Sequence, residues 1–313
     1  MPPRTPRAGP RGRTTRGFAL KPVQREWTGE DVALADVLRR LAALRSGDGE
    51  AGAAPELRTN VMTHIAWVPP EWLEPAHEAL EGLAERHPSR TILLVPYPGD
   101  GDGIDAQVSV LSFPIEGSQL RVSTEVVELR LRGCTSRAPA SVVWPLLISD
   151  LPVFCRWRGL PPFGAPKCEQ LLDVADRLIV DSTEWPGLPN AYRGVVPVFD
   201  RTAVSDFAWA RTGRWRALLA SLWPDIAQVK TIRVRGTEAQ AWLLGGWLRS
   251  RLDKPLELEH DPSERLEGIE LDGEPAPFPP GDPPPPSELL SEELETFGRD
   301  AVYEAAVRAA ASA

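Results

Sequence analysis

The sequence has few of the residues that most often carry redox, metal or nucleophilic chemistry. Its 313 residues include three cysteines with no CxxC pair, and four histidines with no HExxH pattern or His/Cys cluster. Zinc sites need such clusters, so we predict no metal and no other cofactor. Three separated cysteines in a large chain also argue against a disulfide framework. They favour a reducing, cytoplasmic location with buried, structural thiols at Cys134, Cys155 and Cys168.

The sequence also lacks an apolar run long enough to cross a bilayer. Residues 141–163 (SVVWPLLISDLPVFCRWRGLPPF) carry Pro145, Asp150 and Pro152 and then two arginines, whereas a span needs about 20 uninterrupted apolar residues. The N-terminus has no apolar signal-peptide core. We therefore expect no membrane contact, and interpret residues 141–163 as a short helix, a turn at Asp150 and a strand from Pro152 to Trp157.

The net charge of −9 is unevenly distributed along the chain. Residues 1–21 hold six basic residues and no acid, whereas residues 253–304 hold sixteen acids and three basic residues. A basic tail can contact nucleic acid or an acidic partner, but this composition is also typical of a disordered, solvated end, which we assign to residues 1–26. The acidic C-terminal third argues against nucleic acid as the main partner.

Hydrophobic periodicity predicts an α/β fold with two domains that have mixed sheets flanked by helices. We place the N-terminal domain at 27–163 and the C-terminal domain at 164–313, the latter with a proline-rich linker at 273–287 and a terminal helix. The expected helices include one capped by Thr28, one over 72–87, one beginning at Thr212, and one that starts with a capping box at Thr237 and Gln240.

Strands are expected where apolar residues alternate with polar ones or form short continuous runs. In the C-terminal half, LELEH and EGIEL resemble a hairpin, residues 275–286 an extended connector, and Leu290 through Ala301 one amphipathic helix. The expected strands lie at 58–68, 92–95, 106–110, 127–131, 177–182 and 231–236.

Motifs that bind phosphate or perform acyl transfer are missing. GDGDG, residues 99–103, lacks the GxGxxG spacing and precedes a strand, so we interpret it as a turn. Asp181, Ser182 and Thr183 follow a buried strand, where open α/β sheets bind ligands, which makes them candidates for a small-molecule site. Capping of the strand end by the same side chains is the alternative. With no GxSxG elbow or Walker loop, we predict no catalytic residue and no enzyme activity.

Tryptophan and arginine gather in two segments, residues 141–163 and 205–223. Both residue types are enriched at protein interfaces because they bring large contact area and directed donors. Trp215 lies on an apolar helical stripe and is predicted to be core. The predicted contacts with a protein partner are Trp157, Arg158, Trp209, Arg211 and Arg214.

Several motifs, taken in order, resemble the OpcA family of glucose-6-phosphate dehydrogenase assembly proteins. They are HPSR (residues 87–90), the 141–163 segment, ADRLIVDS (175–182), SDFAWARTGRWRALLA (205–220) and LLSEELETFGRDAVYEAAV (289–307). The resemblance implies a non-catalytic protein that binds glucose-6-phosphate dehydrogenase, promotes its active oligomer and supports the oxidative pentose phosphate pathway. The alternative is an α/β regulatory enzyme that binds a sugar phosphate or nucleotide at Asp181, Ser182 and Thr183.

Overall fold

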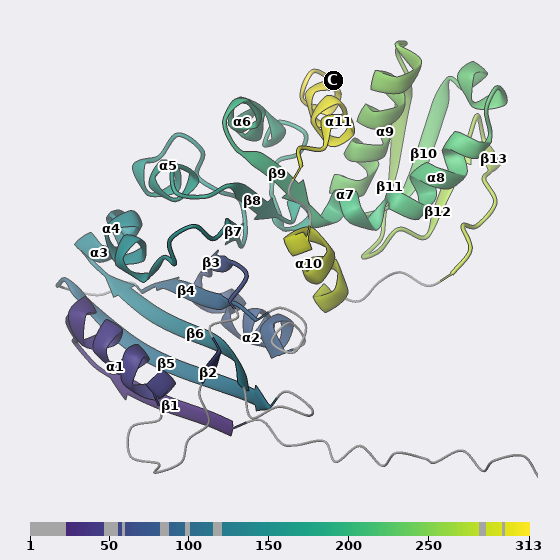
Figure 1. Ribbon diagram of the computed structural model, residues 1–313. Coiled ribbons are helices and arrows are strands. Elements are labelled where there is room, and N and C mark those ends of the chain that lie inside the picture. The colour runs from purple at the N-terminus through teal and green to yellow at the C-terminus, as the bar shows by residue number, and fades with distance from the viewer. Residues whose placement is uncertain are drawn as a thin grey trace, which may run out of the picture.

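The computed structural model describes residues 23–46, 56–57, 60–81, 88–97, 101–114, 121–281, 286–295 and 298–313. These residues form a large and a small β-sheet at opposite ends of an elongated molecule, with helices on the sheet faces (Figure 1). The predicted α/β class with mixed sheets is confirmed. Among the described helices, none is long and apolar enough to cross a membrane.

The larger sheet is mixed, with a parallel centre and an antiparallel edge. Strands β6, β4, β3, β7, β8 and β9 run parallel, while β5 pairs antiparallel with β6 and with β1. The central strands are buried along nearly their whole length, as expected for strands covered by helices on both sides. The order is β1 (Val23–Gly29), β5 (Gly103–Pro114), β6 (Arg121–Arg132), β4 (Arg90–Pro96), β3 (Thr63–Trp67), β7 (Val153–Trp157), β8 (Arg177–Val180) and β9 (Ala203–Asp206), with β2 (Glu56–Leu57) beside β6.

The direction of the connections reverses between β3 and β7. From β3 the chain passes through α2 (Leu73–Glu81) to β4 on one side, whereas from β7 it passes through α5 (Pro166–Leu172) to β8 on the other. These two helices lie on opposite faces of the sheet (Figure 1). Such a topological switch point opens a crevice beside the carboxyl ends of the two strands.

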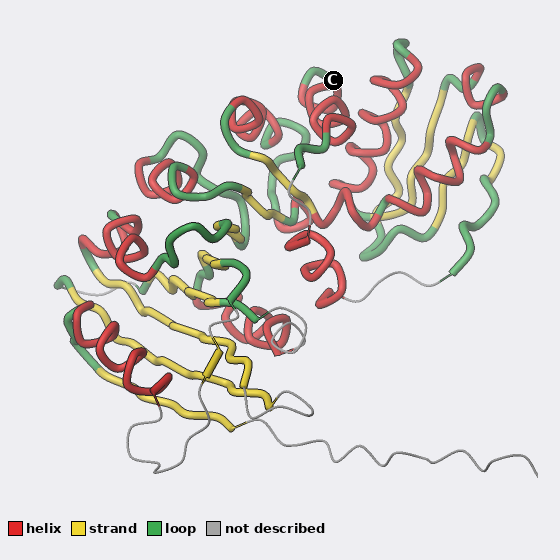
Figure 2. The backbone as a smooth tube through the Cα atoms, in the orientation of Figure 1, coloured by secondary structure: helices red, strands yellow, loops and turns green. Residues whose placement is uncertain are grey.

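Helices cover both faces of the larger sheet (Figure 2). On one face, α10 packs Leu290 and Leu294 against Phe154 of β7 and Ile179 of β8, next to α2. On the other face lie α5, α6 and α11. The helices are α1 (Leu34–Ser46), α2, α3 (Cys134–Arg137), α4 (Pro139–Val143), α5, α6 (Tyr192–Val195), α7 (Phe207–Arg211), α8 (Gly213–Ser221), α9 (Glu238–Leu252), α10 (Pro286–Glu295) and α11 (Ala301–Ala311).

The smaller sheet is built around β10. Its order is β11 (Glu257–Pro262), β10 (Thr231–Gly236), β12 (Gly268–Leu271) and β13 (Glu274–Pro275), with β11 parallel and β12 antiparallel to β10. The predicted hairpin of LELEH and EGIEL is therefore wrong, because β10 lies between these two strands. The alternating pattern of a strand does not specify its neighbour.

Of the side chains predicted to cap helices, some do so in the structure and others do not. The capping box of Thr237 and Gln240 at the start of α9 is confirmed, with both reciprocal hydrogen bonds present. Thr28 belongs to β1 and does not cap a helix. The single C-terminal helix is in fact two, because Asp300 caps a new helix by accepting hydrogen bonds from the N–H groups of Val302 (2.9 Å) and Tyr303 (3.0 Å).

The predicted domain boundaries do not coincide with the sheets. Strand β1 begins at Val23, inside the range 1–26 assigned to the tail, and the larger sheet continues past residue 163 through β8 and β9. Residues 1–22 and 282–285, which include most of the tail and part of the predicted proline-rich linker, lie outside the described residues.

The contact between α9 and α11 provides a test of how the C-terminal helix is held. A Cβ atom at Gly246 would overlap the carbonyl oxygen of Ala306, whereas one at Gly245 would meet only the flexible side chain of Leu258, at 3.2 Å. We expect Gly246→Ala to lower the free energy of unfolding by roughly 1–3 kcal/mol, the usual range for overpacking. The matched Gly245→Ala should be neutral, or more stable by up to about 1 kcal/mol through helix propensity. Urea unfolding of both variants measures the difference; equal stabilities would contradict the predicted packing.

Candidate functional site

A pocket of about 380 Å³ lies at the switch point, on the face covered by α2 and α10. Strands β3 and β7 form its floor, α2 and Leu290 of α10 form walls, and the segments that follow β8 and β9 complete it. Its charged and polar lining is supplied by His64, Glu78, Arg156, Arg158, Asp181, Glu184 and Arg211.

Strand alternation places the polar floor residues on one face. His64 and Ala66 of β3 point into the pocket, while the intervening Ile65 belongs to the core of the opposite face. In β7, Arg156 likewise lines the pocket, and it pairs in register with Ala66. Successive side chains of a strand point to opposite faces, so the parallel pairing of β3 and β7 brings a histidine beside an arginine.

Glu184 holds the two arginines of the β7 segment. It lies in a 3₁₀ turn, Ser182–Glu184, and its Oε1 accepts from Arg156 Nη2 at 3.1 Å and lies 3.0 Å from Arg158 Nε. Its Oε2 accepts from the backbone N–H of Gly159 at 2.6 Å. Burial lowers the pKa of Arg158. Removing one member of such a buried group would leave an uncompensated charge.

Asp181 forms the second charged pair in the pocket. Both of its oxygens accept from Arg211 Nη1, at 2.9 and 2.8 Å, and Oδ1 also accepts from the Thr183 hydroxyl at 2.7 Å. The Phe207 ring lies beside both guanidinium groups, 4.6 Å from Arg156 and 6.0 Å from Arg211.

His64 is the buried polar side chain of the pocket floor without a partner. It is 2% exposed, and neither ring nitrogen has a hydrogen-bond partner in the part of the chain that the structure describes. Burial, and secondarily the charge of Arg156, lower the pKa of His64 to about 4. The ring is therefore neutral at neutral pH, with one nitrogen as donor and the other as acceptor.

The structure separates the three predicted ligand residues. Asp181 lines the pocket, whereas Thr183 lines a neighbouring groove with Arg214. Ser182 is fully buried, and its hydroxyl donates to Asp206 Oδ2 at 2.6 Å. Asp206 also accepts from the backbone N–H groups of Ser182 and Ala208, both at 2.9 Å. This buried network holds the chain together after β8 and β9. It is consistent with the alternative that these side chains cap the end of a strand.

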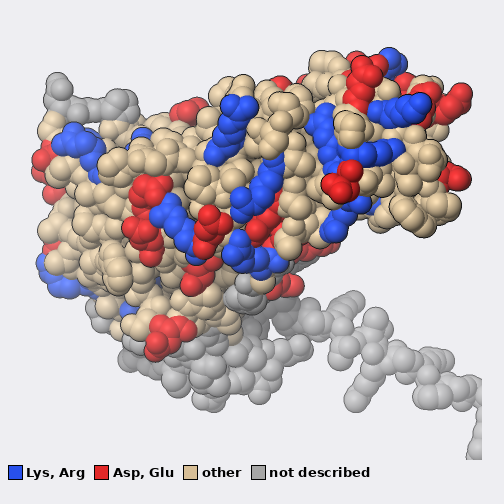
Figure 3. All heavy atoms as spheres, turned by 90° about the horizontal axis from the view of Figure 1, so that it is seen from above, with Lys and Arg blue, Asp and Glu red and all other residues tan. Residues whose placement is uncertain are grey.

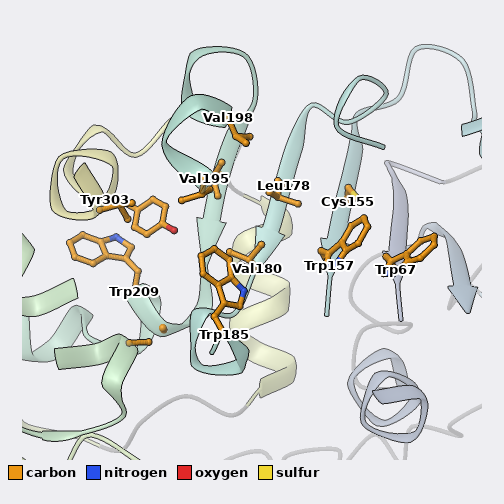
Figure 4. Close-up of a cluster of buried hydrophobic side chains, with 14 of the residues drawn as sticks. Trp67, Cys155, Trp157, Leu178, Val180, Trp185, Val195, Val198, Trp209 and Tyr303 are labelled. Atoms are coloured by element: carbon orange, nitrogen blue, oxygen red, sulfur yellow. The ribbon is translucent and has the colours of Figure 1, made fainter. Parts of the chain in front are cut away.

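The two tryptophans predicted as partner contacts are core residues. Trp157 is 3% exposed and stacks on Trp67 with ring centroids 5.0 Å apart (Figure 4). Trp209 is 5% exposed, lies beside Tyr303 (Figure 4), and donates from Nε1 to Asp300 at 2.7 Å. Core packing therefore explains both positions, contrary to the sequence-based interpretation. Trp215 is buried, as predicted.

The three predicted arginines all have partners within the chain. Arg158 and Arg211 line the pocket with their ion pairs, whereas Arg214 donates to the carbonyl oxygens of Pro279 (2.8 Å), Pro280 (2.9 Å) and Gly281. Arg158 and Arg211 thus meet Asp181 in one site, although sequence reasoning had assigned them to different roles.

Sequence reasoning missed His64, Arg156 and Glu184, since no local motif links them and only strand pairing brings them together. It also missed two tryptophans with large exposed fractions, Trp144 at 64% and Trp223 at 67%. An apolar ring between Val143 and Pro145 gives no sequence signal for its exposure.

The cysteines agree with the prediction in two positions of three. Cys155 and Cys168 are buried, and burial raises the pKa of Cys168 to about 12 and that of Cys155 further. Cys134 is exposed, which corrects the expectation of a buried thiol: it begins the short helix α3 at the end of β6, where its N–H donates to Asp102 at 2.6 Å. Within the described ranges, no cluster of three or more His, Cys, Asp or Glu side chains could hold a metal ion.

The fold and the pocket define the class as a two-sheet α/β protein with a charged crevice at its switch point. Residues 80–195 match the family model described as the glucose-6-phosphate dehydrogenase subunit N-terminal domain, and residues 202–277 match the C-terminal domain of the same subunit. Together the two matches span more than half of the chain. The chain belongs to the OpcA family of glucose-6-phosphate dehydrogenase assembly proteins.

Three curated relatives, each provisionally named OxPP cycle protein OpcA, are similar to this chain. The Synechocystis sp. protein is 26% identical over 58% of this chain and 40% of its own length. The Nostoc punctiforme protein is 27% identical over 55% of this chain and 39% of its own length. The Synechococcus elongatus protein is 26% identical over 61% of this chain and 44% of its own length. The matched part is therefore about two fifths of each relative's length.

The buried Asp206 carboxyl predicts an unusual pH dependence. Burial, with the nearby Asp181 charge as a second cause, raises the pKa of Asp206 from 3.8 to about 6. The folded state therefore favours the protonated form, so this contribution to stability is complete below pH 3.8 and is lost as the pH rises through 6. We expect the unfolding free energy of the wild type, relative to Asp206→Asn, to fall by up to about 3 kcal/mol between pH 4 and 7, at about 1.4 kcal/mol per pKa unit. Urea unfolding at several pH values measures this difference. A constant difference across the range would contradict the raised pKa.

Proposed function

We propose that this protein is a non-catalytic assembly factor that binds glucose-6-phosphate dehydrogenase, promotes its active oligomer and raises its activity. The observation that carries the proposal is the ordered match of both dehydrogenase-subunit domain models, to residues 80–195 and 202–277. The provisional names of the three relatives, which refer to the oxidative pentose phosphate cycle, support the same role.

A second candidate is an α/β regulatory enzyme that acts on a sugar phosphate or nucleotide. The charged pocket at the switch point favours it. However, the described residues that line this pocket include no serine, threonine, cysteine or lysine, and its two buried carboxylates, Asp181 and Glu184, are already paired with arginine. Such a site suits binding better than covalent turnover, so the assembly role is preferred.

We further propose that residues 141–163 contribute to the dehydrogenase-binding surface through Trp144. Its ring is 64% exposed in the 3₁₀ turn Trp144–Leu146, directly after α4. The buried Trp157 would pack beneath the surface formed by residues 141–163. The buried Trp209 would do the same for residues 205–223. Arg158, Arg211 and Arg214 remain proposed contacts with the dehydrogenase. On binding, each would leave its present partner in this chain and bind a group of the dehydrogenase.

The distribution of charged side chains over the surface indicates how strongly the complex should depend on salt. In the face seen in Figure 3, Lys and Arg side chains are interspersed with Asp and Glu over both the larger and the smaller sheet. A surface of mixed sign provides little long-range steering, so apolar anchors such as Trp144 should supply much of the affinity. The complex is therefore expected to survive moderate salt.

The first test is association with the dehydrogenase of the same organism. The two purified proteins should co-elute at micromolar concentration, bury more than about 1,000 Å² of surface and show a higher dehydrogenase rate together than the enzyme alone. Separate elution with an unchanged rate would sink the proposal. Turnover of a sugar phosphate by this chain without its partner would favour the second candidate.

The second test uses three tryptophans that differ in exposure and place. Trp144→Ala should keep its melting temperature and weaken the complex by about 1 kcal/mol or more, as a hot spot does. Trp223→Ala, similarly exposed but in residues 205–223, should keep its melting temperature, and its affinity shows whether this second segment also contacts the dehydrogenase. Trp157→Ala should lose roughly 3–5 kcal/mol of stability because its ring is packed. Thermal melts and dehydrogenase titrations measure these values; unchanged affinity in folded Trp144→Ala would remove it from the interface.

A further inference from the structure

The pocket between α2 and α10 is lined by three arginines and three carboxylates, and one of these carboxylates, Glu78 of α2, is exposed. Three arginine side chains, Arg156, Arg158 and Arg211, face the carboxylates of Asp181 and Glu184. The side chains of Arg156 and Arg158 are 6% and 14% exposed. Charges removed from water in this way interact strongly with an added anion.

The arginines also retain donor geometry that suits a phosphate group. Arg211 engages Asp181 through Nη1, and Arg158 approaches Glu184 through Nε. Each guanidinium carries five N–H donors in a planar fork, and such forks bind phosphate oxygens in pairs. An anion seated between them would use donors that these ion pairs do not occupy.

His64 supplies an independent indication of a ligand. Its buried ring lines the pocket floor, and both nitrogens lack a hydrogen-bond partner among the described residues. A buried polar group left unpaired costs about 1–3 kcal/mol. Because the neutral ring offers one donor and one acceptor, hydroxyl groups, which both donate and accept, are suitable partners. Asp181 and Glu184 can accept from further hydroxyls.

Size and aromatic content narrow the ligand class. The volume of about 380 Å³ lies near the lower end of the range of roughly 300–1,000 Å³ for small-molecule sites. Phe207, the one phenyl, phenol or indole ring among the described lining residues, is already covered by the Arg156 guanidinium at 4.6 Å. A nucleobase would therefore find little aromatic surface here on which to stack.

We propose that this pocket is a binding site for a sugar phosphate, a small polyhydroxy compound with one phosphate monoester. Its phosphate would lie among Arg156, Arg158 and Arg211, and its hydroxyls would bond to His64 and the pocket carboxylates. This site goes beyond the assembly role and does not depend on it, because it is formed within one chain.

The test measures binding to the isolated full chain, without dehydrogenase, so that its outcome is separate from that of the assembly proposal. Glucose 6-phosphate is the probe, and glucose, inorganic phosphate and AMP are the comparisons, by calorimetry and thermal shift. We expect saturable binding of glucose 6-phosphate with a raised melting temperature, and at least tenfold weaker binding of each comparison compound.

Variants locate the site. Arg211→Gln and His64→Leu should each weaken glucose 6-phosphate binding at least tenfold, and His64→Leu should remain folded because it replaces an unpaired polar ring by an apolar side chain. Arg201→Gln is the matched control, since Arg201 pairs with Glu169 and Asp173 at α5, on the other face of the sheet. It should bind within twofold of the wild type.

Three results would overturn the inference. The first is the lack of saturable binding by glucose 6-phosphate. The second is equal or tighter binding of glucose, inorganic phosphate or AMP. The third is unchanged affinity in folded Arg211→Gln and His64→Leu, which would place any binding elsewhere on the chain.

Discussion

The buried carboxylate of Asp206 is the interaction on which the central part of this structure depends. At the end of β9 it caps α7 through the N–H of Ala208, holds the turn after β8 through Ser182, and accepts from the Tyr303 hydroxyl of α11 at 3.3 Å. One side chain thus joins two strand ends and the C-terminal helix. Because Asp181 precedes Ser182 and Glu184 ends the 3₁₀ turn that begins at Ser182, the positions of these two pocket carboxylates follow from this network.

The pocket is built from charges that balance one another. Glu184 neutralises the charge of the β7 arginines in part, and Asp181 pairs with Arg211, so that neither of these two buried carboxylates is left without a positive partner. Buried ion pairs contribute little net stability, but breaking one is costly. The arrangement therefore holds the guanidinium groups in place around two buried carboxylates, while the exposed Glu78 of α2 lines the same pocket.

Local patterns predicted much of the fold. The continuous apolar run of β4, the alternation of β10 and the capping box of α9 are all present, because each depends on contacts a few residues apart. The hairpin of β11 and β12 failed because it required knowledge of a distant element, β10, which lies between the two strands. The single C-terminal helix failed because a local signal, the N-cap Asp300 of α11, was not recognised.

For the site, the sequence alone determined the chemical types available: arginines near Trp157 and Trp209, acids at the end of a buried strand, and buried thiols at Cys155 and Cys168. Only the tertiary structure decided which of them meet. Parallel pairing of β3 with β7 brings His64 beside Arg156, and packing buries Trp157 while Trp144 stays exposed. Periodicity reports the face of an element, whereas burial and pairing depend on neighbours far apart in sequence.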